Sequence, residues 1–261
     1  MLKIIKIVLL VLLALLALAA IALHFSARAA LDKDYSYTTA ANQLPWFAPD
    51  ADDGVVRLRH GEFVFRTRIA GFTRNPAGPL VLLLHGFPTT SAMYADLIPQ
   101  LAAAGYRVLA PDQRGYSPGA RPAGPDSYRV DLLAKDMFDF ATTVGAERFH
   151  LVGHDWGAVV GWQMVLTDPG RVVSWSALSI PHPAAFSEAL REDPQQRRSS
   201  SYFLLFATPW LAESLFAMSD MAALRGMLAP MSDTQMTEYL AMLREPGALT
   251  AAFNWYRATM T

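Results

Sequence analysis

The stretch FHLVGHDWGAVVGWQMV, residues Phe149–Val165, decides the fold of this chain. Its first half is a short apolar run, typical of a strand buried on both faces, and its second half has the spacing of a helix. Between them lies the G-x-D-x-G sequence Gly153-His154-Asp155-Trp156-Gly157. A turn this sharp leaves no room for Cβ atoms at its two glycines. The pattern predicts a nucleophile elbow in which Asp155 stands where a serine is more usual.

Strand and helix patterns alternate before the elbow. Residues 55–71 alternate apolar and polar side chains around a His60-Gly61 turn, which predicts a β-hairpin. Buried strands are predicted in 79–88 and 106–115, and helices in 91–105 and 128–145. This alternation predicts an α/β fold with a mostly parallel sheet and crossover helices, whose core spans residues 55–183.

The pattern changes after the sixth predicted strand. From Ala184 onward the apolar residues fall at three- and four-residue spacing, and no strand pattern occurs. Pro194, Pro209, Pro230 and Pro246-Gly247 interrupt the helical segments. The sequence therefore predicts a helical cap over residues 184–261.

The N-terminal sequence has the pattern of a targeting signal, and a buried core helix is the alternative. Lys3 and Lys6 precede an uncharged apolar run from Ile7 to Leu23, which predicts a signal anchor or a signal peptide in residues 1–30. Since the lysines precede the run, we expect a membrane-anchored protein whose domain lies on the non-cytoplasmic side. The alternative is a secreted or periplasmic protein cleaved at Ala27-Arg28-Ala29, which resembles an A-x-A site. Residues 31–54 are polar and irregular, which predicts a tether.

The composition excludes several classes of site. A formal net charge of −1 over 261 residues gives no electrostatic case for binding nucleic acid. The chain has no cysteine, so disulfides and thiolate metal sites are excluded. His150 and His154 span a strand and its turn and share no helical face, and Gly153, Gly157 and Gly161 do not form a dinucleotide-binding motif. We therefore expect no metal and no cofactor. The oligomeric state is left open.

A carboxylate at the elbow indicates a particular reaction class. A carboxylate oxygen can attack the carbon of an epoxide or a carbon–halogen bond and form an alkyl-enzyme ester. Water then opens the ester, with the help of a general base and an oxyanion hole. The backbone N–H groups of Trp156 and Phe87 are the expected donors of that hole.

Three motifs, HGFP (85–88), DQRGYS (112–117) and GHDWG (153–157), followed by a helical cap, make the chain resemble the epoxide hydrolase branch of the α/β-hydrolase superfamily from about Val55 to the end. The resemblance implies that two cap tyrosines bind the epoxide oxygen and supply a proton. These are Tyr202 and, in the sequence NWYR, Tyr256. It also implies a small apolar epoxide as substrate, in a pocket lined by His85, Pro88 and His154.

Two other functions stay open. A haloalkane dehalogenase would use Trp156 in a halide site, and a membrane-anchored binding protein would not use Asp155 at all. The resemblance also implies an acid and then a histidine after the cap, whereas the last histidine here is His182 and the sequence ends at Thr261. We therefore expect a C-terminally truncated hydrolase, defective in turnover and without its final strands; a naturally short form is the alternative.

Overall fold

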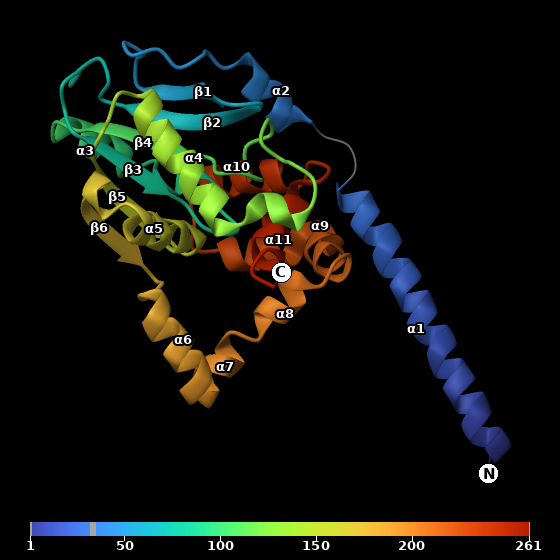
Figure 1. Ribbon diagram of the computed structural model, residues 1–261. Coiled ribbons are helices and arrows are strands. Elements are labelled where there is room, and N and C mark those ends of the chain that lie inside the picture. Colours follow the sequence, from blue (N-terminus) through green and yellow to red (C-terminus); the bar gives the residue numbers. More distant parts are fainter. Residues whose placement is uncertain (1, 32–34, 261) are drawn as a thin grey trace.

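A computed structural model describes residues 2–31 and 35–260 of the protein (Figure 1). Residues 32–34, which belong to the predicted tether, lie outside the described residues. The fold consists of a twisted sheet with helices on its faces, a group of cap helices, and a long N-terminal helix that extends away from both.

The sheet has six strands in the order β1-β2-β4-β3-β5-β6. Their bounds are β1 Gly54–His60, β2 Phe63–Ala70, β3 Leu80–Leu84, β4 Arg107–Pro111, β5 Phe149–His154 and β6 Val172–Leu178. The pairs β1–β2 and β2–β4 are antiparallel, and β4, β3, β5 and β6 run parallel to one another. The predicted hairpin and the mostly parallel sheet are both confirmed. Every side chain of β3 is buried, because helices cover this central strand on both faces.

The helices between the strands are α3 Ile98–Ala103, α4 Val130–Thr143 and α5 Trp156–Thr167, with short 3₁₀ turns at Ser91–Tyr94, Pro125–Tyr128 and Pro169–Arg171. The segment 91–105 was predicted as one helix, and the structure divides it into a 3₁₀ turn and α3. Pro99 stands at the start of α3, where its missing N–H costs no hydrogen bond, so it begins a new helix.

The described residues after β6 form helices and no strand, as predicted from Ala184 onward. These helices are α6 Pro183–Glu192, α7 Pro194–Ser199, α8 Tyr202–Ala207, α9 Leu211–Leu228, α10 Asp233–Leu243 and α11 Ala248–Arg257. Figure 1 shows α9, α10 and α11 gathered beside the sheet, while α6 and α7 project from the end of β6. Helix α9 is kinked, since Ser219, Asp220 and Met221 have positive φ angles.

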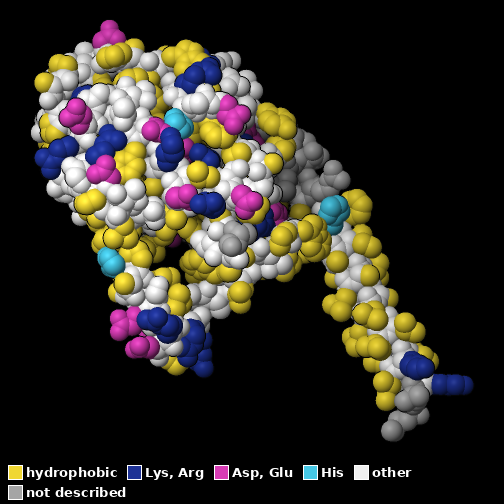
Figure 2. Space-filling model, in the orientation of Figure 1, with side chains coloured by type: hydrophobic (Ala, Val, Ile, Leu, Met, Phe, Trp, Pro, Cys, Tyr) yellow, Lys and Arg dark blue, Asp and Glu magenta, His cyan; other side chains and the backbone are white. Residues whose placement is uncertain are grey.

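Helix α1 spans Leu2–Leu31 and extends far from the body of the molecule (Figure 1). Among the helices of the described residues, α1 alone is long and apolar enough to cross a membrane, over Lys3–Ala27. Figure 2 shows hydrophobic atoms along its whole length, with basic atoms at its free end. Its other end packs against α9 of the cap.

The structure differs from the predicted tether at α2, Ser36–Gln43. Tyr37 is buried, and its hydroxyl donates to Asp112 Oδ2 at 2.7 Å. The N–H and hydroxyl of Thr38 donate to the two carboxylate oxygens of Glu245 at 2.6 and 2.8 Å. This segment is therefore attached to both the sheet and the cap, through partners that its local polarity does not reveal.

Candidate active site

The elbow between β5 and α5 holds Asp155 in an unusual backbone conformation. Asp155 has φ +52° and ψ −122°, a region that residues other than glycine rarely adopt. A Cβ atom on Gly157 would collide with the carbonyl oxygen of Leu84, and one on Gly153 would collide with the carbonyl of Gly157. The chain can therefore make this turn only with glycine at both positions, which holds the carboxylate of Asp155 at the end of β5.

Backbone N–H groups hold the Asp155 carboxylate. The N–H of Phe87 donates to Asp155 Oδ1 at 2.9 Å, and the N–H of Trp156 is a second hydrogen-bond donor to this side chain. Burial raises the pKa of Asp155, and the two N–H groups counteract it only in part. The two donors predicted for an oxyanion hole thus converge on the elbow.

Gly86 is a further requirement of the site that the sequence analysis missed. A Cβ atom at Gly86 would collide with the side chain of Asp155. The signal was present in the HGFP motif, but the motif alone does not reveal which atoms approach its glycine. The loop after β3 must pass so close to Asp155 that Phe87 can reach the carboxylate.

The two cap tyrosines lie together beside the elbow. The ring centroids of Tyr256 and Trp156 are 5.0 Å apart, and those of Tyr256 and Tyr202 are 6.3 Å apart. Burial and the nearby charge of Asp155 raise the pKa of both hydroxyls, that of Tyr256 well above its ordinary value. Both phenols are therefore protonated at neutral pH and available as hydrogen-bond donors.

Helix α11 is fixed on both sides of Tyr256. The indole N–H of Trp255 donates to the carbonyl oxygen of Arg114 at 2.9 Å, in the loop after β4. Arg257 forms an ion pair with Glu213 of α9 at 2.8 Å. These contacts join α11 to the core and to the cap, so the position of Tyr256 is determined by both.

A cavity of about 290 Å³ opens beside Asp155. Its walls come from α5, the segment after β6, and α6 to α8: Asp155, Trp156, Val159, Ser179, Ile180, Pro181, Phe186, Ala189, Gln196, Ser199, Ser200, Tyr202 and Phe203. His85, Pro88 and His154, which were predicted to line the pocket, do not line this cavity. Most of its wall residues belong to no sequence motif, so no local pattern identifies them.

His85 has a structural environment. It is completely buried, its Nε2 accepts from the N–H of Gln113 at 2.9 Å, and its Nδ1 lies 3.1 Å from the carbonyl oxygen of Gly86. Burial lowers the pKa of His85, so its ring is neutral at pH 7. Both ring nitrogens are engaged in ordering the loops after β3 and β4.

His182, the last histidine of the sequence, has a local role as well. Its Nδ1 accepts from the N–H of Ala184 at 3.1 Å at the start of α6, and its ring lies 5.0 Å from that of Trp162. His182 therefore caps the N-terminus of α6, and its Nδ1 is not free to act as a general base.

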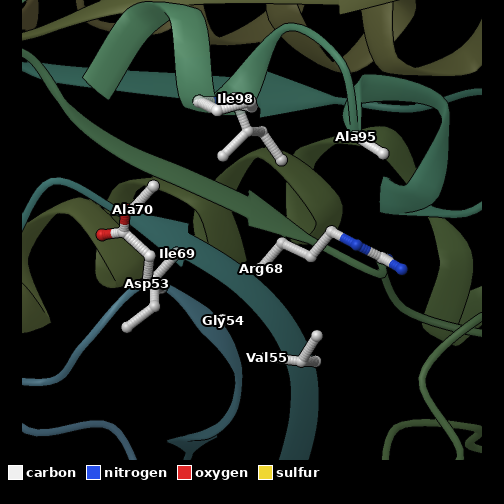
Figure 3. Close-up of a pocket in the computed structure, with 9 residues that line it drawn as sticks. Asp53, Gly54, Val55, Arg68, Ile69, Ala70, Ala95 and Ile98 are labelled. Carbon is white, nitrogen blue, oxygen red and sulfur yellow. The ribbon is translucent and has the colours of Figure 1, made fainter. Parts of the chain in front are cut away.

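A second cavity, of about 270 Å³, lies between the β1–β2 edge of the sheet and α3 (Figure 3). Figure 3 shows the Arg68 side chain extending away from Asp53. Asp53 accepts a hydrogen bond from the N–H of Gly71, and Arg68 pairs with Glu238. The polar groups of this cavity are thus paired with the protein, and we assign it no chemistry. No group of three or more metal-ligating side chains was found among the residues described.

Comparisons with known proteins agree with this arrangement. Residues 79–225 match the family model described as alpha/beta hydrolase fold. The chain is 38% identical over 187 residues to the AB hydrolase superfamily protein YfhM of Bacillus subtilis, covering 69% of this chain and 65% of that protein. It is 32% identical over 213 residues to mouse Epoxide hydrolase 4, covering 77% of this chain and 58% of that protein.

Solved structures are similar as well. The crystal structure of a Bacillus megaterium epoxide hydrolase in complex with an inhibitor has a TM-score of 0.70 and 25% sequence identity, and the match covers 77% of this chain and 71% of that chain. The chain spans less than two thirds of the length of YfhM and of mouse Epoxide hydrolase 4.

Proposed function

Because the chain belongs to the α/β-hydrolase fold family, in its epoxide hydrolase-like branch, we propose that its site opens epoxides by forming an ester with Asp155. The observation that carries the proposal is the meeting of one carboxylate, two backbone donors and two phenols at the elbow. The carboxylate supplies the nucleophile, and the phenols supply a hydrogen bond and a proton to the epoxide oxygen when the ring opens.

The first step forms a carbon–oxygen bond between Asp155 and the less hindered epoxide carbon. The ring carbon–oxygen bond breaks, and its electron pair stays on the ring oxygen. Tyr256 or Tyr202 donates a hydrogen bond to that oxygen and transfers a proton to it, and water then restores the proton of the phenol. The product is a hydroxyalkyl ester of Asp155. Because burial raises the pKa of Tyr256, the phenol gives up its proton only as the alkoxide forms.

The second step would release a diol through attack of water on the ester carbonyl. The N–H groups of Phe87 and Trp156 would then bind the oxyanion at the position now taken by a carboxylate oxygen. Water needs a general base oriented by an acid. His85 and His182 are engaged in other contacts. The Nδ1 of His154, the residue before Asp155, has no hydrogen-bond partner among the described residues, so no carboxylate orients this ring as a base. We therefore propose that the 261-residue polypeptide carries out the first step and retains the ester.

Intact-mass spectrometry after incubation with styrene oxide tests this function. We expect one covalent adduct of the mass of styrene oxide on the full chain, and no adduct on Asp155→Asn. Tyr256→Phe should slow adduct formation by roughly a hundredfold or more, because the developing alkoxide loses its proton donor. Steady release of diol by the parent chain would contradict the retained ester.

The same assay separates the alternatives. A dehalogenase would release halide from 1-chlorobutane, and neither Tyr202→Phe nor Tyr256→Phe would change that rate. A binding protein without catalytic activity would give no adduct with either compound. The two phenols beside Asp155 favour an oxygen leaving group over a halide, since both are set to donate a hydrogen bond.

A further inference from the structure

The exposed part of α1 has nearly the length of a bilayer's apolar core. From Lys3 to Ala19 every side chain is exposed. At a rise of 1.5 Å per residue this segment is about 26 Å long, against a hydrocarbon thickness of about 30 Å. The segment is apolar apart from its two lysines, so water is a poor solvent for it. The protein body begins where this exposed segment ends.

The last turns of α1 belong to the cap. Over residues 3–27, for which burial is described, the partly or fully buried residues of α1 are Ala20, Leu23, His24 and Ala27. Their spacing puts them on one face of the helix, where α9 packs. Ala27 is 5% exposed and joins the main hydrophobic core. The cap is therefore held at the level where α1 would leave a membrane.

Trp210, at the start of α9, lies beside the last turns of α1, at the level where this helix would leave a membrane. Its indole N–H donates to His24 Nδ1 at 3.2 Å, and the two rings are stacked. Trp210 is 46% exposed and Phe25 of α1 is 67% exposed. Aromatic side chains with one polar group favour the boundary between lipid tails and water.

Helix α8, which precedes Trp210 in the chain and packs against α9, also exposes an apolar side chain. Leu204 is 68% exposed, an unusual degree for a leucine on a helix that also packs against α9 and α11. Tyr202, on the same short helix, lines the cavity beside Asp155 and is 42% exposed. We call Leu204, Trp210 and Phe25 the lipid-facing surface. In Figure 2 hydrophobic atoms run from α1 onto the adjoining part of the body.

We propose that α1 crosses a bilayer, that this lipid-facing surface lies in the interface of the same bilayer, and that the cavity beside Asp155 takes up lipophilic epoxides dissolved in it. The substrate class rests on the proposed function, whereas the position of the surface does not. Lipid is the expected occupant because Phe25 belongs to α1 itself and Trp210 contacts His24 of α1. If a second copy of the cap covered this surface instead, the exposed apolar side chains of α1 would still lack a partner.

Site-specific fluorescence tests the position of the surface. The chain has no cysteine, so a single cysteine can be introduced and labelled with the environment-sensitive dye NBD. Leu204→Cys is the test variant. Glu147→Cys is the control, because Glu147 is exposed and precedes β5, at the opposite end of this strand from Asp155. Both full-length chains are placed in phosphatidylcholine nanodiscs, one chain per disc, with or without lipid carrying a nitroxide near its headgroup.

We expect the label at residue 204 to emit at shorter wavelength and to be quenched several-fold more strongly by the nitroxide lipid than the label at residue 147. Equal, weak quenching at the two positions would overturn the proposal. A blue shift that occurs only in discs with two or more chains would identify a second copy as the occupant, and would overturn it too.

Adduct formation tests the source of the substrate. In nanodiscs, Leu204→Asp should slow adduct formation with 1,2-epoxyoctadecane, which stays in lipid, by about tenfold, because the charge lifts the cavity mouth from the interface. The rate with water-soluble 1,2-epoxybutane should not change. Leu166→Asp, at an exposed leucine of α5, is the control and should change neither rate.

Equal slowing of adduct formation with both epoxides would overturn uptake of the substrate from lipid. If the parent chain forms no adduct at all, the proposed function fails, and the fluorescence result still decides the position of the surface.

Discussion

Single residues at the elbow determine whether Asp155 can react. The carboxylate accepts from the N–H of Phe87 at 2.9 Å only because the loop after β3 passes beside it without a side chain at Gly86. Asp155 itself has a positive φ, so the turn has little freedom to adjust. The reaction therefore depends on a close approach of two loops as much as on the nucleophile.

Gly86→Ala tests this dependence. The new methyl group would displace the Asp155 side chain from its position, and a shift of about 1 Å typically costs roughly a hundredfold in rate. We expect adduct formation with styrene oxide to slow by about that factor, measured by intact mass, while the far-ultraviolet circular dichroism stays unchanged. Gly54→Ala is the matched control, because no atom lies within 4 Å of its added Cβ. An unchanged rate for Gly86→Ala would refute the steric argument.

At the scale of elements, α2 shows how a polar segment is ordered by distant partners. Its Tyr37 hydroxyl reaches Asp112 across 75 positions of sequence, and Thr38 reaches Glu245 across 207. Glu245 is completely buried and also pairs with Arg121 at 2.7 Å. One short helix thus links the sheet, the loop after β4 and the cap.

Tyr37→Phe should loosen α2. Removing a hydroxyl that donates to a carboxylate costs about 1.5–3 kcal/mol in free energy of unfolding, and it leaves Asp112 with one donor fewer. We expect lower stability in urea and faster proteolysis between α1 and α2. Tyr35→Phe is the control, since Tyr35 is 56% exposed, and it should behave like the parent chain. Equal effects of the two substitutions would mean that α2 is not held by this bond.

These contacts also explain what the sequence could and could not predict. The elbow, the strand–helix alternation and the all-helical cap depend on local patterns, so Asp155 and the strand β5 were predictable. The attachment of α2 and the cavity wall at Ser179 and Phe186 depend on tertiary contacts, which no local pattern records. The two phenols came from the family resemblance and not from helical spacing, because a tyrosine on an amphipathic helix is usually a packing residue.

At the scale of the whole molecule, a buried group of charges joins the core to the cap. Asp112, at the end of β4, pairs with Arg66 of β2 at 2.9 Å and accepts from the hydroxyl and N–H of Ser91. Arg66 and Arg68 both pair with Glu238 of α10. Burial opposes the ionisation of Asp112, but the two arginines outweigh it and hold its pKa at about 2.

This depressed pKa predicts sensitivity to acid. The folded pKa lies below the ordinary value, so the stabilisation by Asp112 is complete above about pH 4 and is lost as the pH falls towards 2. For a shift of this size the loss is roughly 2 kcal/mol. Asp112→Asn should lower the free energy of unfolding by about 3 kcal/mol at pH 7, since Arg66 loses a buried partner. Its stability should also depend less on pH between 4 and 2, as followed by urea titration at each pH. A slope equal to that of the parent would assign the acid sensitivity to other carboxyl groups.

The short connection between α1 and α2 limits where the molecule can act. Helix α1 ends at Leu31 and α2 begins at Ser36, and five residue steps of fully extended chain reach at most about 18 Å. With α1 in a bilayer, the catalytic body could neither leave the surface nor turn far from it. Its encounters with substrate would then be collisions in two dimensions, with a rate governed by the mole fraction of epoxide in the lipid and not by its concentration in water.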